Sequence, residues 1–214
     1  MNSSGIISIV CWTFFFSLAL RLLFVFLAPA FGGDSQTYEI VAQNILSNGC
    51  VSFSTPEFGE CKPHWGGNHL PGYPSFLALS WFISDHSVLA PLILQAIIAA
   101  SLVSYLTWTT INMYGSFYGK IVALIMSISP ITIAWPRMEL TETLSISFSI
   151  WILAALVRSI NDKKIHWFEL GIVCAIGIFL RYDFIILLVP IFYMAFKIEL
   201  PIRALRVCIL VTLI

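Results

Sequence analysis

The feature that most constrains the fold is a run of 26 residues, 88–113, that contains no charged side chain. A helix needs about 20 mostly apolar residues to cross a bilayer, so this run predicts a membrane span. The apolar runs 6–30, 121–135 and 143–157 predict three more. Because membrane β-barrels show short alternating segments instead, we expect an all-α, polytopic membrane protein.

The composition excludes the other broad classes. The chain is 59% hydrophobic and 10% charged, whereas soluble domains carry roughly 25% charged residues, so a water-soluble enzyme is excluded. Eleven basic and eleven acidic residues leave no basic excess for binding nucleic acid. The abundance of Phe, Trp, Tyr, Leu and Ile excludes disorder.

Residues 32–70 are the only long polar stretch, and we expect residues 32–87 to form an extracytoplasmic loop. Within it, one set of apolar residues has helical period and predicts an amphipathic helix on the membrane surface, namely Tyr38, Val41, Ala42, Ile45 and Leu46. The run 75–83 is too short to cross and predicts a re-entrant or interfacial helix. In an extracytoplasmic loop, Cys50 and Cys61 would form a disulfide.

The segment 167–198 carries Arg181, Tyr182 and Asp183 at its middle. Basic clusters at 158–164 and 197–206 flank it, and cytoplasmic loops are rich in Lys and Arg. If both clusters are cytoplasmic, the segment crosses twice. Each crossing then covers about 22 Å at a rise of 1.5 Å per residue, which is short of a hydrocarbon core about 30 Å thick. We therefore expect a hairpin whose charged turn is recessed in a protein-lined or watery cavity.

A last run, 207–214, predicts the start of another helix. The sequence thus predicts a single module over residues 1–214 with six to seven spans, incomplete at its C-terminus, in the plasma or inner membrane.

The expected topology divides the charged residues between the two sides of the membrane, with Arg21 inside the first span. The outer set is Asp34, Glu39, Glu57, Glu60, Asp85, Glu139, Glu142 and Asp183 with Lys62, Arg137 and Arg181. The inner set is Lys120, Arg158, Lys163, Lys164, Lys197, Arg203 and Arg206 with Asp162, Glu169 and Glu199.

Three acids of the outer set are candidates for chemistry. Asp34 follows Gly32 and Gly33, which let a substrate approach, and is a candidate general base; the alternative is a solvated acid that ends the helix. Glu139 and Glu142 lie three apart on one helical face. With Asp34 they could line one cavity that orients a hydroxyl or binds a divalent cation, although no ligand spacing demands a metal. The alternative is a favourable interaction with the helix dipole.

Arg181 is the sharpest position on physical grounds, because a charge inside an apolar hairpin is expensive. Its guanidinium suits a phosphate, which it grips with two parallel hydrogen bonds. The alternative is an ion pair with Asp183 or another outer acid. His64 and His69 lie in a loop rich in Gly and Pro, where substrate contact competes with simple solvation.

Four stretches in this order resemble the N-terminal part of a GT-C-fold membrane glycosyltransferase of the protein mannosyltransferase-like superfamily, which includes lipid A and lipopolysaccharide sugar transferases. They are Gly32-Gly33-Asp34 with Ser35-Gln36-Thr37-Tyr38, then His69-Leu70-Pro71-Gly72-Tyr73-Pro74, then Ser129-Pro130 with Arg137 and Glu142, and finally 171–177 with Leu180-Arg181. Members of this family are longer than this chain.

The resemblance implies that Asp34 is catalytic. We also expect six residues to contact substrates, namely Tyr38, His69, Arg137, Glu139, Glu142 and Arg181. The resemblance also implies a polyprenyl-phosphate sugar donor, a glycan, lipid or protein acceptor, transfer on the extracytoplasmic face and inversion at the sugar carbon. Arg181 and Arg137 would stabilise the leaving phosphate. The sequence identifies no cofactor, and a divalent cation is left open.

Two alternatives remain at this point. A transporter or flippase would use the same intramembrane charges as a substrate path, but no inverted repeat relates the two halves. A truncated, non-catalytic fragment of such a transferase is the other.

Overall fold

The computed structural model describes residues 3–27, 29–30, 32–53 and 70–198, and all of its regular elements are helices. In chain order they are α1 (Ser3–Leu27), α2 (Ser35–Asn48), α3 (Gly72–Ser84), α4 (Leu89–Tyr114), α5 (Ser116–Ile128), α6 (Pro130–Ala134), η1 (Trp135–Arg137), α7 (Thr141–Asn161), α8 (Trp167–Leu180), η2 (Tyr182–Leu187) and α9 (Leu188–Ile198). Over these residues the only β pairing is an isolated bridge between Ala30 and Met138, so the expected all-α class is confirmed.

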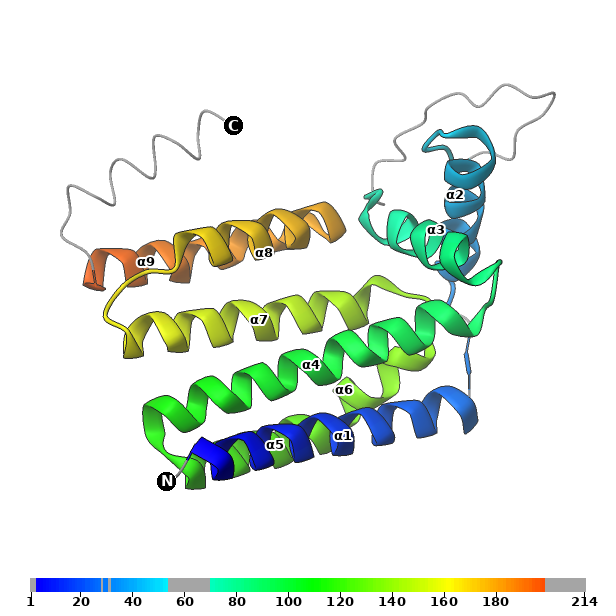
Figure 1. The fold of residues 1–214 in the computed structure, drawn as a ribbon. Helices are drawn as coiled ribbons and strands as arrows, with labels where there is room; N and C mark the ends of the chain where they lie inside the picture. Colours follow the sequence, from blue (N-terminus) through cyan, green and yellow to red (C-terminus); the bar gives the residue numbers. More distant parts are fainter. Residues whose placement is uncertain (1–2, 28, 31, 54–69, 199–214) are drawn as a thin grey trace.

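The long helices lie side by side, with α4 packed against α1, α5 and α7 (Figure 1). The amphipathic helix expected around Tyr38 is α2, and it lies across one end of this bundle instead of along it (Figure 1). The short helix α3 packs against α2 at the same end. The expected loop region 32–87 therefore contributes two helices that cover one end of the bundle.

Three helices of the described chain are long and apolar enough to cross a membrane, namely α1, α4 and α7, and the bent pair of α5 with α6 and η1 adds a fourth. These are the four spans that the apolar runs predict. The remaining crossings that we expect within the described residues are α8 and α9, which have 14 and 11 residues. They are roughly 21 and 16 Å long, short of the hydrocarbon core. The run 207–214 lies outside the described residues.

The segment 167–198 is the expected hairpin. α8 and α9 run in opposite directions, and the turn between them lies at the end of the bundle that α2 and α3 cover (Figure 1). Arg181 stands at this turn in an extended backbone conformation. The pattern of basic residues on either side of the segment therefore predicted its path correctly.

The third span is broken by Pro130, and its two halves meet at 52°. Proline has no N–H, so the carbonyl of Met126 lacks its helical donor. That oxygen instead accepts from Thr132 Oγ1 at 2.9 Å and from Arg21 Nη2 at 3.4 Å. Arg21 is fully buried in α1, and its Nη1 donates to the carbonyl of Ser17 at 2.9 Å. A cation at the carboxyl end of α5 also suits the dipole of that helix, which accounts for an arginine inside the first span.

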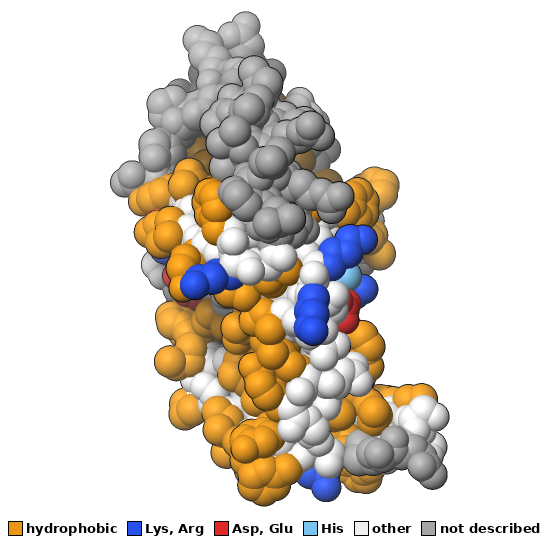
Figure 2. All heavy atoms as spheres, turned by 90° about the vertical axis from the view of Figure 1, so that its left-hand side faces the viewer, with side chains coloured by type: hydrophobic (Ala, Val, Ile, Leu, Met, Phe, Trp, Pro, Cys, Tyr) orange, Lys and Arg blue, Asp and Glu red, His pale blue; other side chains and the backbone are white. Residues whose placement is uncertain are grey.

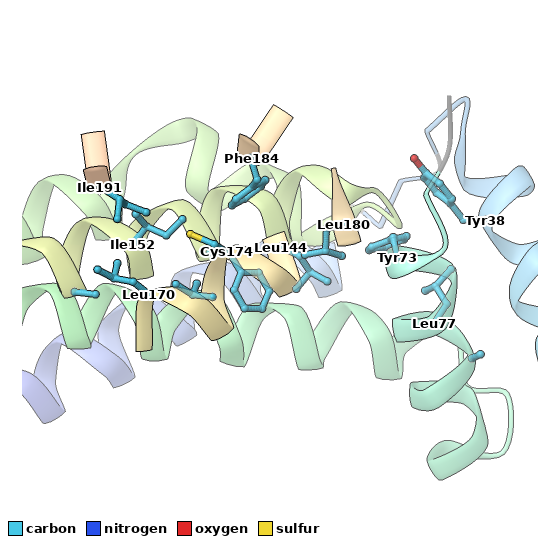
Figure 3. Close-up of a cluster of buried hydrophobic side chains, with 14 of the residues drawn as sticks. Tyr38, Tyr73, Leu77, Leu144, Ile152, Leu170, Cys174, Leu180, Phe184 and Ile191 are labelled. Carbon is cyan, nitrogen blue, oxygen red and sulfur yellow. The ribbon is translucent and has the colours of Figure 1, made fainter. Parts of the chain in front are cut away.

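The larger hydrophobic core joins α2 and α3 to the α7–α8–α9 layer (Figure 3). Tyr38 and Tyr73 meet edge to face, with ring centroids 5.1 Å apart, beside Leu180. A Cβ on Gly72 would lie 2.3 Å from the carbonyl oxygen of Phe179, so only glycine allows this approach. This contact places the start of α3 against the end of α8, next to Arg181.

The charges of the described residues separate to the two ends of the bundle. We call the end covered by α2 and α3 the acidic end, with Asp34, Glu39, Asp85, Glu139, Glu142 and Asp183 against Arg137 and Arg181. The opposite, basic end has Lys120, Arg158, Lys163, Lys164 and Lys197 against Asp162 and Glu169. Figure 2 shows the Lys and Arg side chains that stand out on the basic end.

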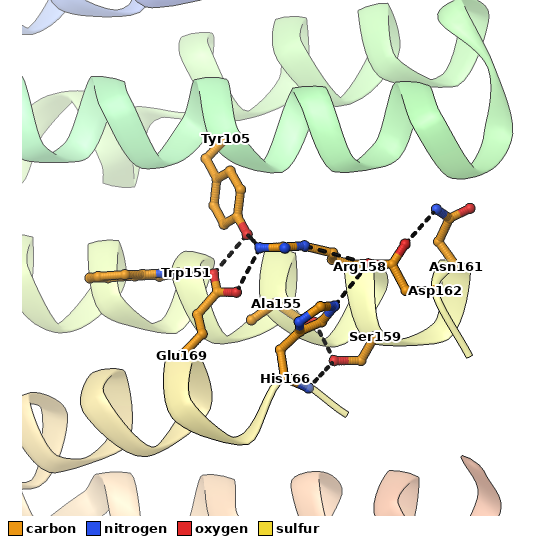
Figure 4. Close-up of polar contacts among 9 residues, drawn as sticks. All are labelled: Tyr105, Trp151, Ala155, Arg158, Ser159, Asn161, Asp162, His166 and Glu169. Atoms are coloured by element: carbon orange, nitrogen blue, oxygen red, sulfur yellow. Dashed lines mark hydrogen bonds and ion pairs between the residues drawn. The ribbon is translucent and has the colours of Figure 1, made fainter. Parts of the chain in front are cut away.

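The basic end is tied together by a hydrogen-bonded network between α4, α7 and α8 (Figure 4). Glu169 Oε1 accepts from Tyr105 at 2.7 Å and from Trp151 at 2.9 Å, and Arg158 Nη1 donates to Glu169 Oε2 at 3.1 Å. Asp162 contacts Arg158 at 3.6 Å and His166 at 2.8 Å. The hydrogen bond from His166 lowers the pKa of Asp162.

Candidate functional site

Asp34 occupies the N-cap position of α2, where its side chain is exposed and makes no capping hydrogen bond. Residues on both sides of Asp34 are hydrogen-bonded to the segment that joins η1 to α7. The Ala30 N–H donates to the Arg137 carbonyl at 3.0 Å, and Ser35 Oγ donates to the Glu139 carbonyl at 3.0 Å. The carboxylate of Asp34 is therefore at the surface, and it makes no hydrogen bond that caps α2.

A polar cavity of about 180 Å³ brings four of the sequence-predicted residues together. Its lining comes from α2, α7 and the α8–η2 turn, and it consists of Asp34, Tyr38, Leu70, Thr141, Glu142, Leu180, Arg181 and Tyr182. Asp34, Tyr38, Glu142 and Arg181 are distant in sequence, so the meeting of α2 with the start of α7 and the end of α8 creates this site.

Tyr38 is nearly buried and points its ring into the core beside Tyr73 (Figure 3). Burial raises the pKa of its hydroxyl, and the negative charges of Asp34 and Glu142 raise it further, while Thr141 and Arg181 oppose them. Tyr38 therefore stays a neutral hydrogen-bond donor at the wall of the cavity.

Arg181 forms ion pairs with two carboxylates. Its Nη1 lies 3.3 Å from Glu142 Oε1 and its Nη2 lies 3.1 Å from Asp183 Oδ2. The ion pair that the sequence left as an alternative is therefore present. The Arg181 side chain is nevertheless 40% exposed and Asp183 is 50% exposed, so a ligand can still reach the guanidinium.

An apolar groove of about 550 Å³ starts at the same arginine. One wall is a stripe at helical spacing on α7 and the other is η2; the lining is Glu142, Ser145, Ile146, Ser149, Ile150 and Leu153 with Arg181, Asp183, Phe184, Ile186 and Leu187. From Glu142 to Leu153 the stripe extends roughly 16 Å along α7. Glu142 and Arg181 line both the groove and the polar cavity, so they form the junction between them.

Glu139 does not line the cavity; it is 1% exposed, and no donor of the described residues reaches its carboxylate oxygens. Burial and the neighbouring carboxylate of Glu39 raise the pKa of Glu139 to about 8. Two carboxyl groups in contact repel unless one holds a proton. Glu139 thus holds a proton at neutral pH, beside the carboxylate of Glu39, and a role in direct substrate contact stays a prediction.

The remaining candidates are placed as follows. Arg137 ends η1, outside the lining of the polar cavity, and its carbonyl holds Ala30. His69 and Cys61 lie outside the described residues. Cys50 is disulfide-bonded, and its pairing with Cys61 stays a prediction. Over the described chain, no group of three or more His, Cys, Asp or Glu side chains could hold a metal ion.

Sequence reasoning missed two features of the site. Gln95 of α4 is fully buried, and its Nε2 donates to the carbonyls of Pro136 and Met138, each at 2.8 Å. The available signal was an amide inside a run with no charged residue. The groove could have been found from the spacing of Ser145 and Ser149 on α7, where two hydroxyls interrupt an apolar stripe.

A second groove of about 350 Å³ lies between α1 and α5 toward the basic end. Lys120 is its one basic lining residue, beside Trp12, Phe16 and Leu124, and its lining includes no acid. It therefore lacks the combination of carboxylates and arginine that marks the acidic end.

Residues 68–213 match the family model of dolichyl-phosphate-mannose-protein mannosyltransferase. The match covers more than half of the chain and includes Glu142, Arg181 and the α7–η2 groove, while Asp34 and Tyr38 precede it. No curated protein and no solved structure matches the chain. On the family match, the chain belongs to the dolichyl-phosphate-mannose-protein mannosyltransferase family of GT-C-type membrane glycosyltransferases.

Proposed function

We propose that this protein transfers a sugar from a polyprenyl-phosphate donor to an acceptor hydroxyl on the extracytoplasmic side of the membrane, with inversion at the sugar carbon. The observation that carries the proposal is the position of Arg181, at the junction of a polar cavity that contains Asp34 and an apolar groove along α7. A donor of this class has the same order of parts: an apolar chain, a phosphate and a sugar.

The three parts of the donor fit the three parts of the site. The apolar chain would lie in the α7–η2 groove, with its phosphate at Arg181 and its sugar in the polar cavity toward Asp34. An arginine is suited to phosphate because its planar guanidinium offers two parallel donors. The acceptor, a glycan, lipid or protein, would reach Asp34 from its exposed side.

The donor phosphate must compete with carboxylates for Arg181. Arg181 already faces Glu142 and Asp183, and a phosphate adds more negative charge. Asp183 is the more exposed of the two carboxylates, at 50% against 32% for Glu142. The donor phosphate would therefore replace Asp183 at Nη2, while Glu142 keeps the guanidinium in place. A divalent cation remains an untested prediction, and these steps need none.

The chemistry follows from this placement. Asp34 takes the proton of the acceptor hydroxyl, and the resulting oxygen forms a bond to the anomeric carbon of the sugar. The bond from that carbon to the phosphate oxygen breaks, and its electron pair stays on the phosphate, next to Arg181. One displacement from the face opposite the leaving group inverts the configuration. General-base assistance of this kind contributes about 10²- to 10⁴-fold.

Orientation in the membrane is part of the proposal. Cytoplasmic segments carry an excess of Lys and Arg, so the basic end would face the cytoplasm. The acidic end, with Asp34 and Arg181, would then face the extracytoplasmic side. The depth of the hairpin turn, set by the short α8 and α9, would hold the donor phosphate near the headgroups.

The test is transfer from a labelled polyprenyl-phosphate sugar, in membranes that contain the protein expressed from its complete gene. We expect Asp34→Asn to lower transfer at least 100-fold while the protein accumulates and melts as the wild type does. Asp85→Asn is the matched control, since it makes the same change in an exposed acid at the same end. Its left-handed backbone, with φ of 53°, also suits asparagine. Transfer by Asp34→Asn at the wild-type rate would refute the proposal.

A further inference from the structure

The residues on both sides of Asp34 are held by hydrogen bonds to backbone groups. The Ala30 N–H donates to the Arg137 carbonyl at 3.0 Å. Ser35 Oγ donates to the Glu139 carbonyl at 3.0 Å and accepts from the Gly32 N–H at 2.9 Å. The segment 137–139 is thus the surface on which the Asp34 loop is held.

This segment lies at and just beyond the end of the short helix η1, where the last carbonyls of a helix lack helical donors. η1 ends at Arg137, and Met138 is extended, with φ of −117° and ψ of 142°. The carbonyls of Pro136 and Met138 therefore need donors from outside a helix, because unpaired buried backbone groups are costly. Both are supplied by one side chain, Gln95 Nε2, at 2.8 Å each.

Gln95 is itself held on its other side. It is fully buried in α4, and its Oε1 accepts from the Tyr73 hydroxyl of α3 at 3.3 Å. The amide therefore uses two donors and one acceptor to connect α3 and α4 to the 136–138 segment. A buried polar network is rigid when all its members are satisfied.

We propose that Gln95 is a positioning residue, which sets the place of Asp34 by fixing the 136–139 segment on which the Asp34 loop is held. The functional part rests on the proposed function, since it takes Asp34 as the base. A misplacement of about 1 Å can cost about 100-fold in rate. Loss of Gln95 should therefore lower kcat and leave the groove and Arg181, and so the affinity for the donor, intact.

The test uses Gln95→Leu in the full-length protein, with two readouts. In the transfer assay we expect kcat to fall at least tenfold, with the KM for the donor within about twofold of the wild type. By hydrogen exchange we expect faster exchange at the amides of Ala30, Gly32 and Ser35, without faster exchange in the middle of α4. The matched control is Ser104→Ala, which removes a buried hydroxyl of the same helix that bonds only its own backbone, at Ala100.

Two further variants test the same proposal if Gln95→Leu does not fold. Ser35→Ala removes the hydroxyl that donates to the Glu139 carbonyl and accepts from the Gly32 N–H, and it should give the same fall in kcat. Tyr73→Phe removes one of the three bonds of Gln95 and should give a smaller one. An unchanged kcat in Ser35→Ala, or equal effects of Gln95→Leu and Ser104→Ala, would overturn the proposal. If Asp34→Asn kept its transfer rate, the proposed function would fail, while the exchange result would still test the link from Gln95 to the loop.

Discussion

The two ends of the bundle both carry clustered charges, but they differ in how these charges are satisfied. At the basic end, Glu169 accepts from Tyr105, Trp151 and Arg158, and Asp162 is held by Arg158 and His166. At the acidic end, Asp34 makes no capping bond and Glu139 has no donor among the described residues. A saturated network serves stability, whereas the exposed carboxylate of Asp34, which lines the polar cavity, is available for a ligand.

The difference extends to shape. The polar cavity and the larger groove meet at Arg181 of the acidic end, whereas the network of the basic end links α4, α7 and α8 by hydrogen bonds (Figure 4). Perturbed pKa values occur both in functional sites and in structural ion-pair networks, so they do not distinguish the two ends. The comparison therefore predicts that mutations at the acidic end change activity, and that mutations at the basic end change stability.

The largest effect expected in these tests is that of Arg181→Ala. Removing the guanidinium takes away charged hydrogen bonds to the donor phosphate, each worth about 1.5–3 kcal/mol. We expect the KM for the donor to rise about 10- to 100-fold, measured in the transfer assay. Arg158→Ala, the same change at the basic end, should leave this KM within about twofold. Equal effects of the two variants on KM would remove the distinction between the ends.

Glu169→Ala tests the other side of the comparison. It leaves Tyr105, Trp151 and Arg158 without their shared acceptor, and the expected loss of stability is about 2 kcal/mol. Thermal unfolding in detergent should show it as a lower melting temperature, with the kcat of the remaining folded protein unchanged. A variant that melts like the wild type but transfers slowly would contradict the structural role of this network.

Glu139→Gln tests the protonated acid at the acidic end. The folded-state pKa of about 8 lies above the ordinary value of 4.5, so between these pH values the folded protein holds a proton that the unfolded chain has lost. Its contribution to stability is complete below pH 4.5 and declines as pH rises to about 8, by at most about 1.4 kcal/mol per pH unit. Glutamine mimics the protonated acid, so this decline should vanish from melting curves recorded between pH 5.5 and 8.5.

Asp85→Asn, which alters an exposed acid, should keep the wild-type decline. If Glu139→Gln kept it as well, Glu139 would not be the group that holds the proton.

The smallest effect is expected for Asp183→Asn. It removes the carboxylate that competes with the donor phosphate at Arg181, so the KM for the donor should fall about two- to fivefold. The amide cannot form the ion pair, but Glu142 still holds the guanidinium. A rise in KM would mean that Asp183 orients Arg181 instead of competing with the donor.

The sequence allowed much of this arrangement to be predicted, because bilayer thickness and backbone hydrogen bonding restrict what an apolar chain can do. The four spans follow from run lengths, the helix α2 follows from the helical period of its apolar residues, and the hairpin at Arg181 follows from the sides on which Lys and Arg lie. The donors that satisfy the backbone at the Pro130 break could not be predicted, because Arg21 reaches the Met126 carbonyl from a helix more than a hundred residues earlier.

For the site, the sequence identified candidate residues by their chemistry, but it did not predict which of them meet in the folded protein. Asp34, Tyr38, Glu142 and Arg181 were candidates from sequence, and the structure brings them to one cavity. Glu139 was a candidate for the same cavity, but a helical spacing of three residues does not apply to it, because it precedes the start of α7. Gln95 acts through backbone carbonyls of a segment 41 residues later, a contact that no local pattern in the sequence reports.

The most direct test of the central claim is a structure of the complete protein with a short-chain polyprenyl phosphate bound. We expect the phosphate within hydrogen-bonding distance of Arg181, with Asp183 displaced and the chain lying along α7 between Ser145 and Leu153. A phosphate bound instead at Lys120, with the chain between α1 and α5 and the Arg181 groove unoccupied, would contradict it.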